Sequence, residues 1–316
     1  MIILPTVRGG VFPVFNNLLG KGSYGQVFGP FTRDEIRRFL STFYKGPPIK
    51  LREDDQYVIK KVLPNNGLTC QDLVKKNKAY AGILRLLTSS ERRLFILPII
   101  VGCIGDTMFE VQRFGGKEVY EVLLSGDKIG NPALFFRRLI QIMETCMRLV
   151  DKGVLLTDLK PENMVMMPDG SVCVIDFDTK VMRKNKPFLF TLHPQIIPIQ
   201  FLNLDVKSTR DAKVERYLST YTGDKDSLIR ALHASDTIPA STIAKFSIVW
   251  CIAHIIHLAL VRSVRGNGGP LFMSTVLTPL IRERMTVPLM THTGRIKNFI
   301  KRYFSPKPKS DGRMRP

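Results

Sequence analysis

The segment from residue 154 to residue 176 constrains the fold of this chain more than any other feature of its sequence. It contains three short apolar runs, at 154–156, 164–166 and 172–175, which have the length and composition of buried strands. The loop 158–163, which reads Asp-Leu-Lys-Pro-Glu-Asn, separates the first run from the second. The third run is followed directly by Asp176, which lies 18 residues after Asp158. We therefore expect short buried strands whose connecting segments carry carboxylate, amide and ammonium side chains.

These side chains match the requirements of phosphoryl transfer to a hydroxyl. That reaction needs a carboxylate to orient the hydroxyl and accept its proton, a cation near the phosphoryl group, and oxygen ligands for Mg²⁺. Asp158 offers the carboxylate and Lys160 the cation. Asn163 and Asp176 offer the metal ligands. The alternative interpretation is that 158–163 is an ordinary solvated turn.

A glycine-rich segment lies near the N-terminus. Residues 20–27 read Gly-Lys-Gly-Ser-Tyr-Gly-Gln-Val and fit the pattern G-x-G-x-x-G-x-V. Glycines allow backbone N–H groups to approach phosphate oxygens without interference from a Cβ atom. Two alternatives are an ordinary glycine-rich loop and a dinucleotide-binding turn, which must run from a strand into a helix. The β-type residues that follow Gly25 favour a strand–loop–strand.

A lysine-containing strand is predicted at residues 57–63. Alternation along a strand places Val58, Lys60 and Val62 on one face and Ile59 and Lys61 on the other. A lysine beside a phosphate-binding hairpin neutralises phosphate charge. Considered alone, however, a lysine in a strand is most often a solvated edge residue.

The order of these segments along the chain resembles the protein-kinase family: glycine loop, strand lysine, catalytic loop, then an apolar strand ending in Asp-Phe. The resemblance covers residues 16–180. It implies an α+β, two-lobe protein-kinase-like fold with a small β-rich N-lobe at 1–113 and a larger, mainly helical C-lobe at 114–303. Residues 29–56 interrupt the N-lobe as an insertion with a short helix inside it. The basic tail at 304–316 is expected to be disordered.

The resemblance also implies site residues and cofactors. The implied activity is that of a serine/threonine protein kinase that uses ATP and Mg²⁺. Asp158 would be the catalytic base and Lys160 the γ-phosphate contact, with Asn163 and Asp176 as metal ligands. Lys60 would contact the α- and β-phosphates. The implied ATP-binding residues are Leu19, Gly20, Lys21, Gly22, Ser23, Tyr24, Gly25, Gln26, Val27, Val58 and Lys60.

Several family features are missing or altered. Leu156-Thr157 stands where the family usually has His-Arg, so we expect activity that does not depend on phosphorylation of the activation loop. Asp178 replaces the usual glycine, and the expected helix at 72–87 has no glutamate to pair with Lys60. The nearest acids are Asp72 and Glu91, and the Ala-Pro-Glu motif is absent. These departures keep a pseudokinase scaffold as an alternative interpretation. The pattern of retained catalytic residues and lost scaffold motifs resembles the divergent kinases of large DNA viruses.

The net charge bears on the partners. The chain has 47 Lys and Arg residues against 27 Asp and Glu, so the formal charge is 47 − 27 = +20. A hydrophobic content of 44% excludes a disordered polyelectrolyte, because such chains cannot bury enough apolar surface to fold. The charge favours acidic or phosphorylated protein substrates, or association with nucleic acid. A basic nucleic-acid-binding protein on a kinase-like fold is thus an alternative, and a small-molecule phosphotransferase is a weaker one.

The compartment is inferred from cysteines and apolar segments. The five cysteines are scattered without metal-ligand spacing, which favours a reducing compartment, the cytoplasm or nucleus, in a host cell or virion if the protein is viral. Pro5 interrupts the N-terminus before a signal-peptide apolar region could form. The apolar segment 243–261 carries Lys245 and two histidines, which favours a core helix and no membrane association.

Overall fold

The structure of the protein is a computed structural model. The chain separates into two compact units, and each is described by itself. The first contains residues 1–117, 163–167 and 173–179, and the second contains the remainder. The predicted division at residue 113 stays a prediction. The residues that the structure describes are 2–4, 6–7, 10–22, 25–62, 69–70, 82–156, 159–175, 179–181, 240–264, 266–283 and 287–304.

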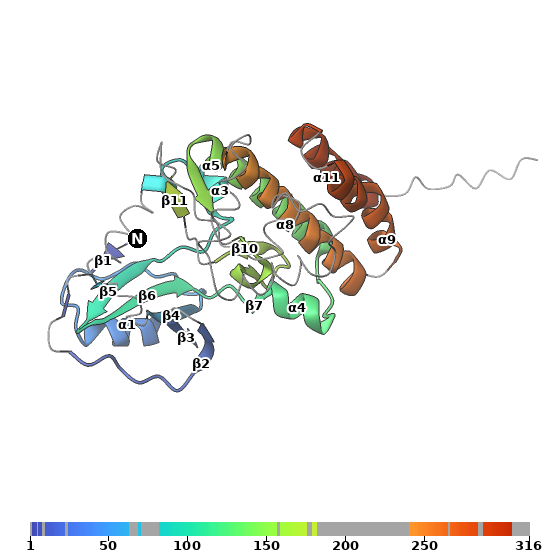
Figure 1. The fold of residues 1–316 in the computed structure, drawn as a ribbon. Coiled ribbons are helices and arrows are strands. Elements are labelled where there is room, and N and C mark those ends of the chain that lie inside the picture. The colour runs from blue at the N-terminus through green and yellow to red at the C-terminus, as the bar shows by residue number, and fades with distance from the viewer. Residues whose placement is uncertain are drawn as a thin grey trace, which may run out of the picture. The chain divides into compact units, whose positions relative to one another are not determined.

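The first unit is built on a six-stranded sheet in the order β1-β5-β6-β4-β3-β2 (Figure 1). β1 pairs with β5 in parallel, and the remaining neighbours are antiparallel. The strands are β1 (Ile2–Ile3), β2 (Leu18–Gly22), β3 (Gly25–Phe31), β4 (Tyr57–Val62), β5 (Ile100–Ile104) and β6 (Thr107–Arg113). The strands predicted on both sides of the glycine loop, at 57–63 and in the 95–114 region are thereby confirmed, although β5 begins later than expected.

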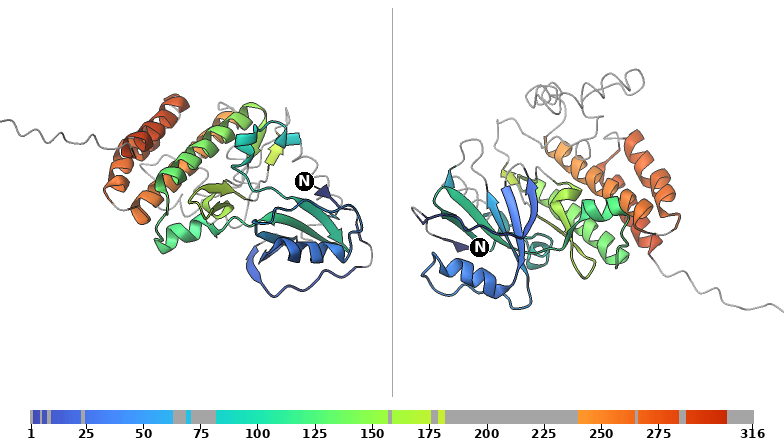
Figure 2. Two further views of the ribbon diagram at one scale, coloured as in Figure 1. Left: turned by 180° about the vertical axis from the view of Figure 1, so that it is seen from behind. Right: turned by 90° about the horizontal axis from the view of Figure 1, so that it is seen from below.

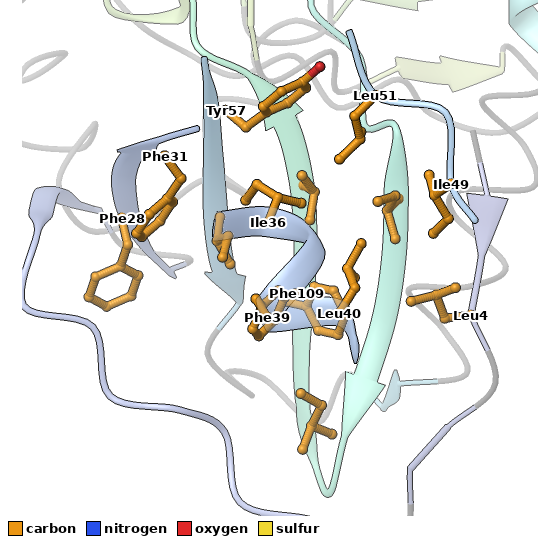
Figure 3. Close-up of a cluster of buried hydrophobic side chains, with 14 of the residues drawn as sticks. Leu4, Phe28, Phe31, Ile36, Phe39, Leu40, Ile49, Leu51, Tyr57 and Phe109 are labelled. Atoms are coloured by element: carbon orange, nitrogen blue, oxygen red, sulfur yellow. The ribbon is translucent and has the colours of Figure 1, made fainter. Parts of the chain in front are cut away.

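Helix α1 (Arg33–Ser41) covers one face of this sheet, and it confirms the short helix predicted inside the insertion. Thr32 begins the helix with a capping box, in which its side chain accepts from the Glu35 backbone and Glu35 accepts from the Thr32 backbone. Ile36, Phe39 and Leu40 face inward at the spacing of one helical face. They pack against sheet residues that include Phe109, as Figure 3 shows.

The opposite face of the sheet has a smaller apolar cluster of Val101, Cys103 and Met108, with Val62 and Cys70 packed against it. Cys103 is joined to Cys70 by a disulfide, with the two Cα atoms 6.3 Å apart. The spacing of the cysteines in the sequence gave no indication of this bridge. Most of the helix predicted at 72–87 lies outside the described residues, which here resume at 82 and include α3 (Ser89–Arg92).

Two small sheets contain the short apolar runs that were predicted as strands. One has the order β10-β9-β7, with β7 at Lys117–Glu118, β9 at Met164–Met166 and β10 at Val172–Val174. The other joins β8 (Val154–Leu156) to β11 (Thr179–Val181). All three strands predicted between residues 154 and 175 are confirmed.

The second unit is mainly helical, and its long helices are α5 (Pro132–Asp151), α8 (Ala240–Arg262) and α11 (Leu289–Tyr303). α8 packs against both α5 and α11, and Figure 2 shows α5 and α8 side by side in two views. The shorter elements are α4 (Val119–Ser125), α9 (Gly268–Phe272), the π-helical turn η3 (Met273–Leu277) and α10 (Thr278–Glu283). The helices predicted at 132–152 and 243–261 are confirmed.

Helix α8 is the one candidate membrane span among the described helices, by length and composition. Its most apolar part, 244–262, has a mean hydropathy of 1.8, and 67% of the tested window is buried within the protein. Val249, Ile252 and Ile256 are completely buried. This burial agrees with the interpretation of the segment as a core helix.

Candidate active site

The glycine-rich segment forms an antiparallel hairpin. β2 pairs with β3 from Leu18 opposite Phe28 to Gly22 opposite Gly25. Of the predicted ATP-binding residues, β2 contains Leu19, Gly20, Lys21 and Gly22. The first residue of β3 is Gly25. Gln26 and Val27 continue β3, whereas Ser23 and Tyr24 lie outside the described residues. Because the second arm is a strand and not a helix, the dinucleotide-binding alternative is wrong.

The first and third glycines of the motif have different surroundings. A Cβ atom on Gly25 would collide with the backbone carbonyl of Lys61 on β4. A Cβ atom on Gly20 would meet nothing within 4 Å. Gly25 is therefore required by the packing of the sheet itself, whereas the space above Gly20 is open to another molecule.

Strand β4 presents Lys60 on the face that the sequence predicted. Ile59 belongs to the core beneath α1, and Lys61 Nζ lies 5.4 Å from the centre of the Phe12 ring in that same core. Val62 packs on the opposite cluster of Val101, Cys103 and Met108. Val58 and Lys60 share the face of Val62, because side chains alternate along a strand. The pairing of Lys60 with Val27 places this lysine beside the glycine hairpin.

The loop predicted as catalytic is attached to helix α8 by a hydrogen bond to its backbone. Lys160 directly precedes the 3₁₀ turn η1 (Pro161–Asn163) and is half-buried. Leu159 is 2% exposed, and its carbonyl accepts a hydrogen bond from the Cys251 thiol of α8 at 3.2 Å. Asp158, the predicted base, lies outside the described residues. The role of Cys251 was not predicted, because 92 residues separate it from its partner.

A backbone hydrogen bond joins the segments that carry the two predicted metal ligands. The Ile175 N–H donates to the Asn163 carbonyl at 2.8 Å, at the open end of the β9–β10 pair. Asn163 is 8% exposed. Asp176 is the next residue after Ile175 and lies outside the described residues. Strand pairing thus brings Asn163 opposite Ile175, the residue that precedes Asp176 in the sequence.

The far end of this hairpin is closed by a polar turn. Asp169 Oδ1 accepts a hydrogen bond from the Ser171 N–H at 2.8 Å. Hydrogen bonds that Ser171 donates to the Asp169 carboxylate, first from its side-chain hydroxyl and then from its backbone N–H, lower the pKa of this carboxyl. Gly170 has φ +79°, and a Cβ atom there would press on the backbone of Asn131. The turn therefore contributes to the pairing that aligns Asn163 with Ile175.

Residues 94–96 hold β10 from its other side. The Val174 N–H donates to the Leu94 carbonyl at 2.8 Å, and the Ile96 N–H donates to the Val174 carbonyl at 2.8 Å. Ile96 also packs with Val165 and Cys173 in a small apolar cluster. The strand that leads to Asp176 is therefore tied to the same unit as the glycine hairpin.

Of the two acids nearest to Lys60 in the sequence pattern, Glu91 is described by the structure and Asp72 is not. Glu91 caps α3, where its Oε2 atom accepts from the Thr88 N–H and hydroxyl, each at 2.8 Å. Asp72 lies outside the described residues, as do Thr157, Asp178 and the whole segment 182–239.

No family model matches the chain. It is 24% identical over 193 residues to protein kinase C delta type of Rattus norvegicus, and 23% identical over 195 residues to protein kinase 2 of Dictyostelium discoideum. These matches cover 60% and 59% of this chain, but only 25% and 35% of the two relatives. The similarity is distant, and it supports a relationship to protein kinases. The mixed α+β architecture, with a sheet in the N-terminal part and helices later, is compatible with a kinase-like fold.

Proposed function

We propose that the chain is a serine/threonine protein kinase that transfers the γ-phosphate of ATP to protein hydroxyls. The hydrogen bond between Ile175 and Asn163 carries the proposal, because it pairs one predicted metal ligand with the residue that precedes the other, Asp176, in the sequence. The glycine hairpin and Lys60 belong to the same compact unit as this pair. The distant kinase relatives add independent support.

In the proposed reaction each side chain has one task. Asp158 orients the substrate hydroxyl and accepts its proton as the oxygen attacks the γ-phosphorus, and ADP leaves. Lys160 compensates negative charge on the transferred group. Lys60 binds the α- and β-phosphates beneath the backbone of the glycine hairpin. The protein thus contributes position and charge, and the reaction requires no covalent enzyme intermediate.

The donor set suits Mg²⁺. Asn163 offers an amide oxygen and Asp176 a carboxylate, and Mg²⁺ prefers hard oxygen ligands combined with substrate phosphates. When bound, the ion neutralises charge on the β- and γ-phosphate oxygens. No sulfur or imidazole ligand is present at these two positions.

The decisive experiment incubates the purified full chain with Mg²⁺, γ-labelled ATP and a mixed protein substrate such as casein or histone. We expect phosphoserine or phosphothreonine from the wild type and at least a hundredfold less from Asp158→Asn, since that variant lacks the general base. Equal labelling by the two proteins contradicts an enzymatic function.

Two other outcomes identify the alternatives. ATP binding without phosphate transfer supports a pseudokinase scaffold, to which the missing helix glutamate and Asp178 point. Retention on nucleic acid that falls with salt, without ATP turnover, supports a basic nucleic-acid-associated protein. Labelling of a small molecule in preference to protein supports a small-molecule phosphotransferase.

A further inference from the structure

We propose that Glu110 is the carboxylate partner of Lys60, supplied by the neighbouring strand of the sheet in place of a glutamate on a helix. The inference deepens the proposed function and rests on it, because the task of the pair is to position the lysine for ATP. In this arrangement Glu110 is a positioning residue, and it acts on the nucleotide through Lys60.

The strand register places the two residues directly opposite each other. In the antiparallel pair of β4 and β6, Lys60 lies across from Glu110, with Val58 across from Gln112 and Val62 across from Met108. Directly opposed residues project to the same face, with Cβ atoms about 5 Å apart. A lysine and a glutamate at that separation are within reach of an ion pair.

Glu110 has no competitor among the strands of the sheet. It is the one acidic residue in β1 to β6, all of whose residues are described. The other strand cations, Lys21, Lys61 and Arg113, are assigned by the same register to the face covered by α1. Lys60 is thus the strand cation that shares a face with Glu110.

The surroundings of Glu110 favour an ion pair. Its neighbour on β5 is Val101, which is completely buried, and the adjacent cluster contains Cys103 and Met108. A half-buried carboxylate beside such apolar groups is stabilised by an opposite charge. Gln112, only 7% exposed, donates from Nε2 to Glu110 Oε2 at 2.9 Å and orients the carboxylate.

The position of Glu110 on a strand explains how Lys60 can be held without a glutamate on the helix predicted at 72–87. Glu91 already serves as the cap of α3. A carboxylate on a rigid strand holds the lysine ammonium at a fixed place beside the glycine hairpin, whatever the neighbouring helix contributes. Binding groups that are fixed beforehand lose less conformational entropy when the ligand arrives.

The first arm of the test measures affinity for Mg-ATP by calorimetry in Glu110→Gln, Lys60→Ala and the double variant. Exposed Glu121 on α4, changed to Gln, is the matched control. We expect Glu110→Gln to weaken binding roughly tenfold, the usual scale for a charged hydrogen bond. The double variant should bind no more weakly than Lys60→Ala alone. Unchanged affinity in Glu110→Gln, or additive losses in the double variant, overturns the pairing.

The second arm needs no nucleotide. Acylation of Lys60 and Lys61 is followed by mass spectrometry at one pH, because a carboxylate partner keeps an amine protonated and slow to react. Glu110→Gln should speed acylation of Lys60 several-fold and leave Lys61 unchanged, with Glu110→Asp intermediate. If Lys60 reacts at one rate in all three proteins, the pair does not exist. If acylation responds but the wild type binds no Mg-ATP, the pair stands and the proposed function fails.

Discussion

At the scale of single residues, Lys60 and Lys61 show how one step along a strand changes the role of a side chain. Lys61 lies over the Phe12 ring in the core beneath α1, whereas Lys60 faces the opposite cluster. We predict that Lys60→Ala reduces kinase activity at least tenfold, while Lys61→Ala retains most of it. Lys61→Ala should cost stability instead, about 0.5–1 kcal/mol for the lost cation–π contact. Steady-state ATP kinetics and urea unfolding separate the two effects, and equal loss of activity in both variants would refute the assignment of faces.

The glycines of the hairpin give a second prediction at this scale. Gly25→Ala should lower the thermal midpoint by several degrees, because the new Cβ atom collides with the Lys61 carbonyl. Gly20→Ala should leave the midpoint nearly unchanged, since the space is empty, but raise KM for ATP if phosphates approach there. Differential scanning fluorimetry measures the thermal midpoint, and initial rates at varied ATP concentration measure KM. A Gly20→Ala protein with normal KM would argue against phosphate binding at this strand.

At the scale of secondary-structure elements, the capping box of α1 is a separable contribution to stability. Thr32 Oγ1 accepts from the Glu35 N–H at 3.3 Å, and Glu35 Oε2 accepts from the Thr32 N–H at 2.7 Å. Thr32→Ala should destabilise the protein by about 1 kcal/mol, with Thr32→Ser nearly neutral. Urea titrations of the two variants provide the comparison, and equal midpoints for Thr32→Ala and the wild type would show that the cap contributes little.

The β9–β10 hairpin supplies a pH-dependent prediction. The pKa of Asp169 is lowered in the folded protein by hydrogen bonds from Ser171. The ionised carboxylate therefore stabilises the fold at pH values above the ordinary pKa of an aspartate. This stabilisation is lost as pH falls through the lowered folded pKa. Asp169→Asn should therefore melt at a lower temperature than the wild type at neutral pH, and the difference should shrink as the solution is acidified. A difference that is constant from neutral to acidic pH would contradict this origin.

At the scale of the whole molecule, the charge of +20 should act on the choice of substrate. Positive surface potential raises the encounter rate with anionic partners, and salt screens it. We predict that kcat/KM for an acidic peptide falls more steeply with ionic strength than kcat/KM for a neutral peptide of equal length. Parallel salt dependences would remove substrate selection as the reason for the charge.

Local sequence patterns determined much of this protein. Period-two alternation located β4 and the face of Lys60, and three glycines located the β2–β3 hairpin. The apolar spacing on one face predicted α5, the long apolar run at 243–261 predicted α8, and α1 was predicted as a short helix inside the insertion. These features depend on neighbours within a few residues, so they can be read along the chain.

Only the tertiary structure decided which distant residues meet. Nothing local indicates that Glu110 lies opposite Lys60, that Ile175 bonds to Asn163, or that Cys251 supports Leu159. Each contact follows from strand register or helix packing, which is chosen by burial of apolar surface over the whole unit. A shift of one residue in the β4–β6 register would turn Glu110 away from Lys60. The sequence by itself thus determined the chemical groups and their local elements, and the three-dimensional packing decided which of those groups can act together.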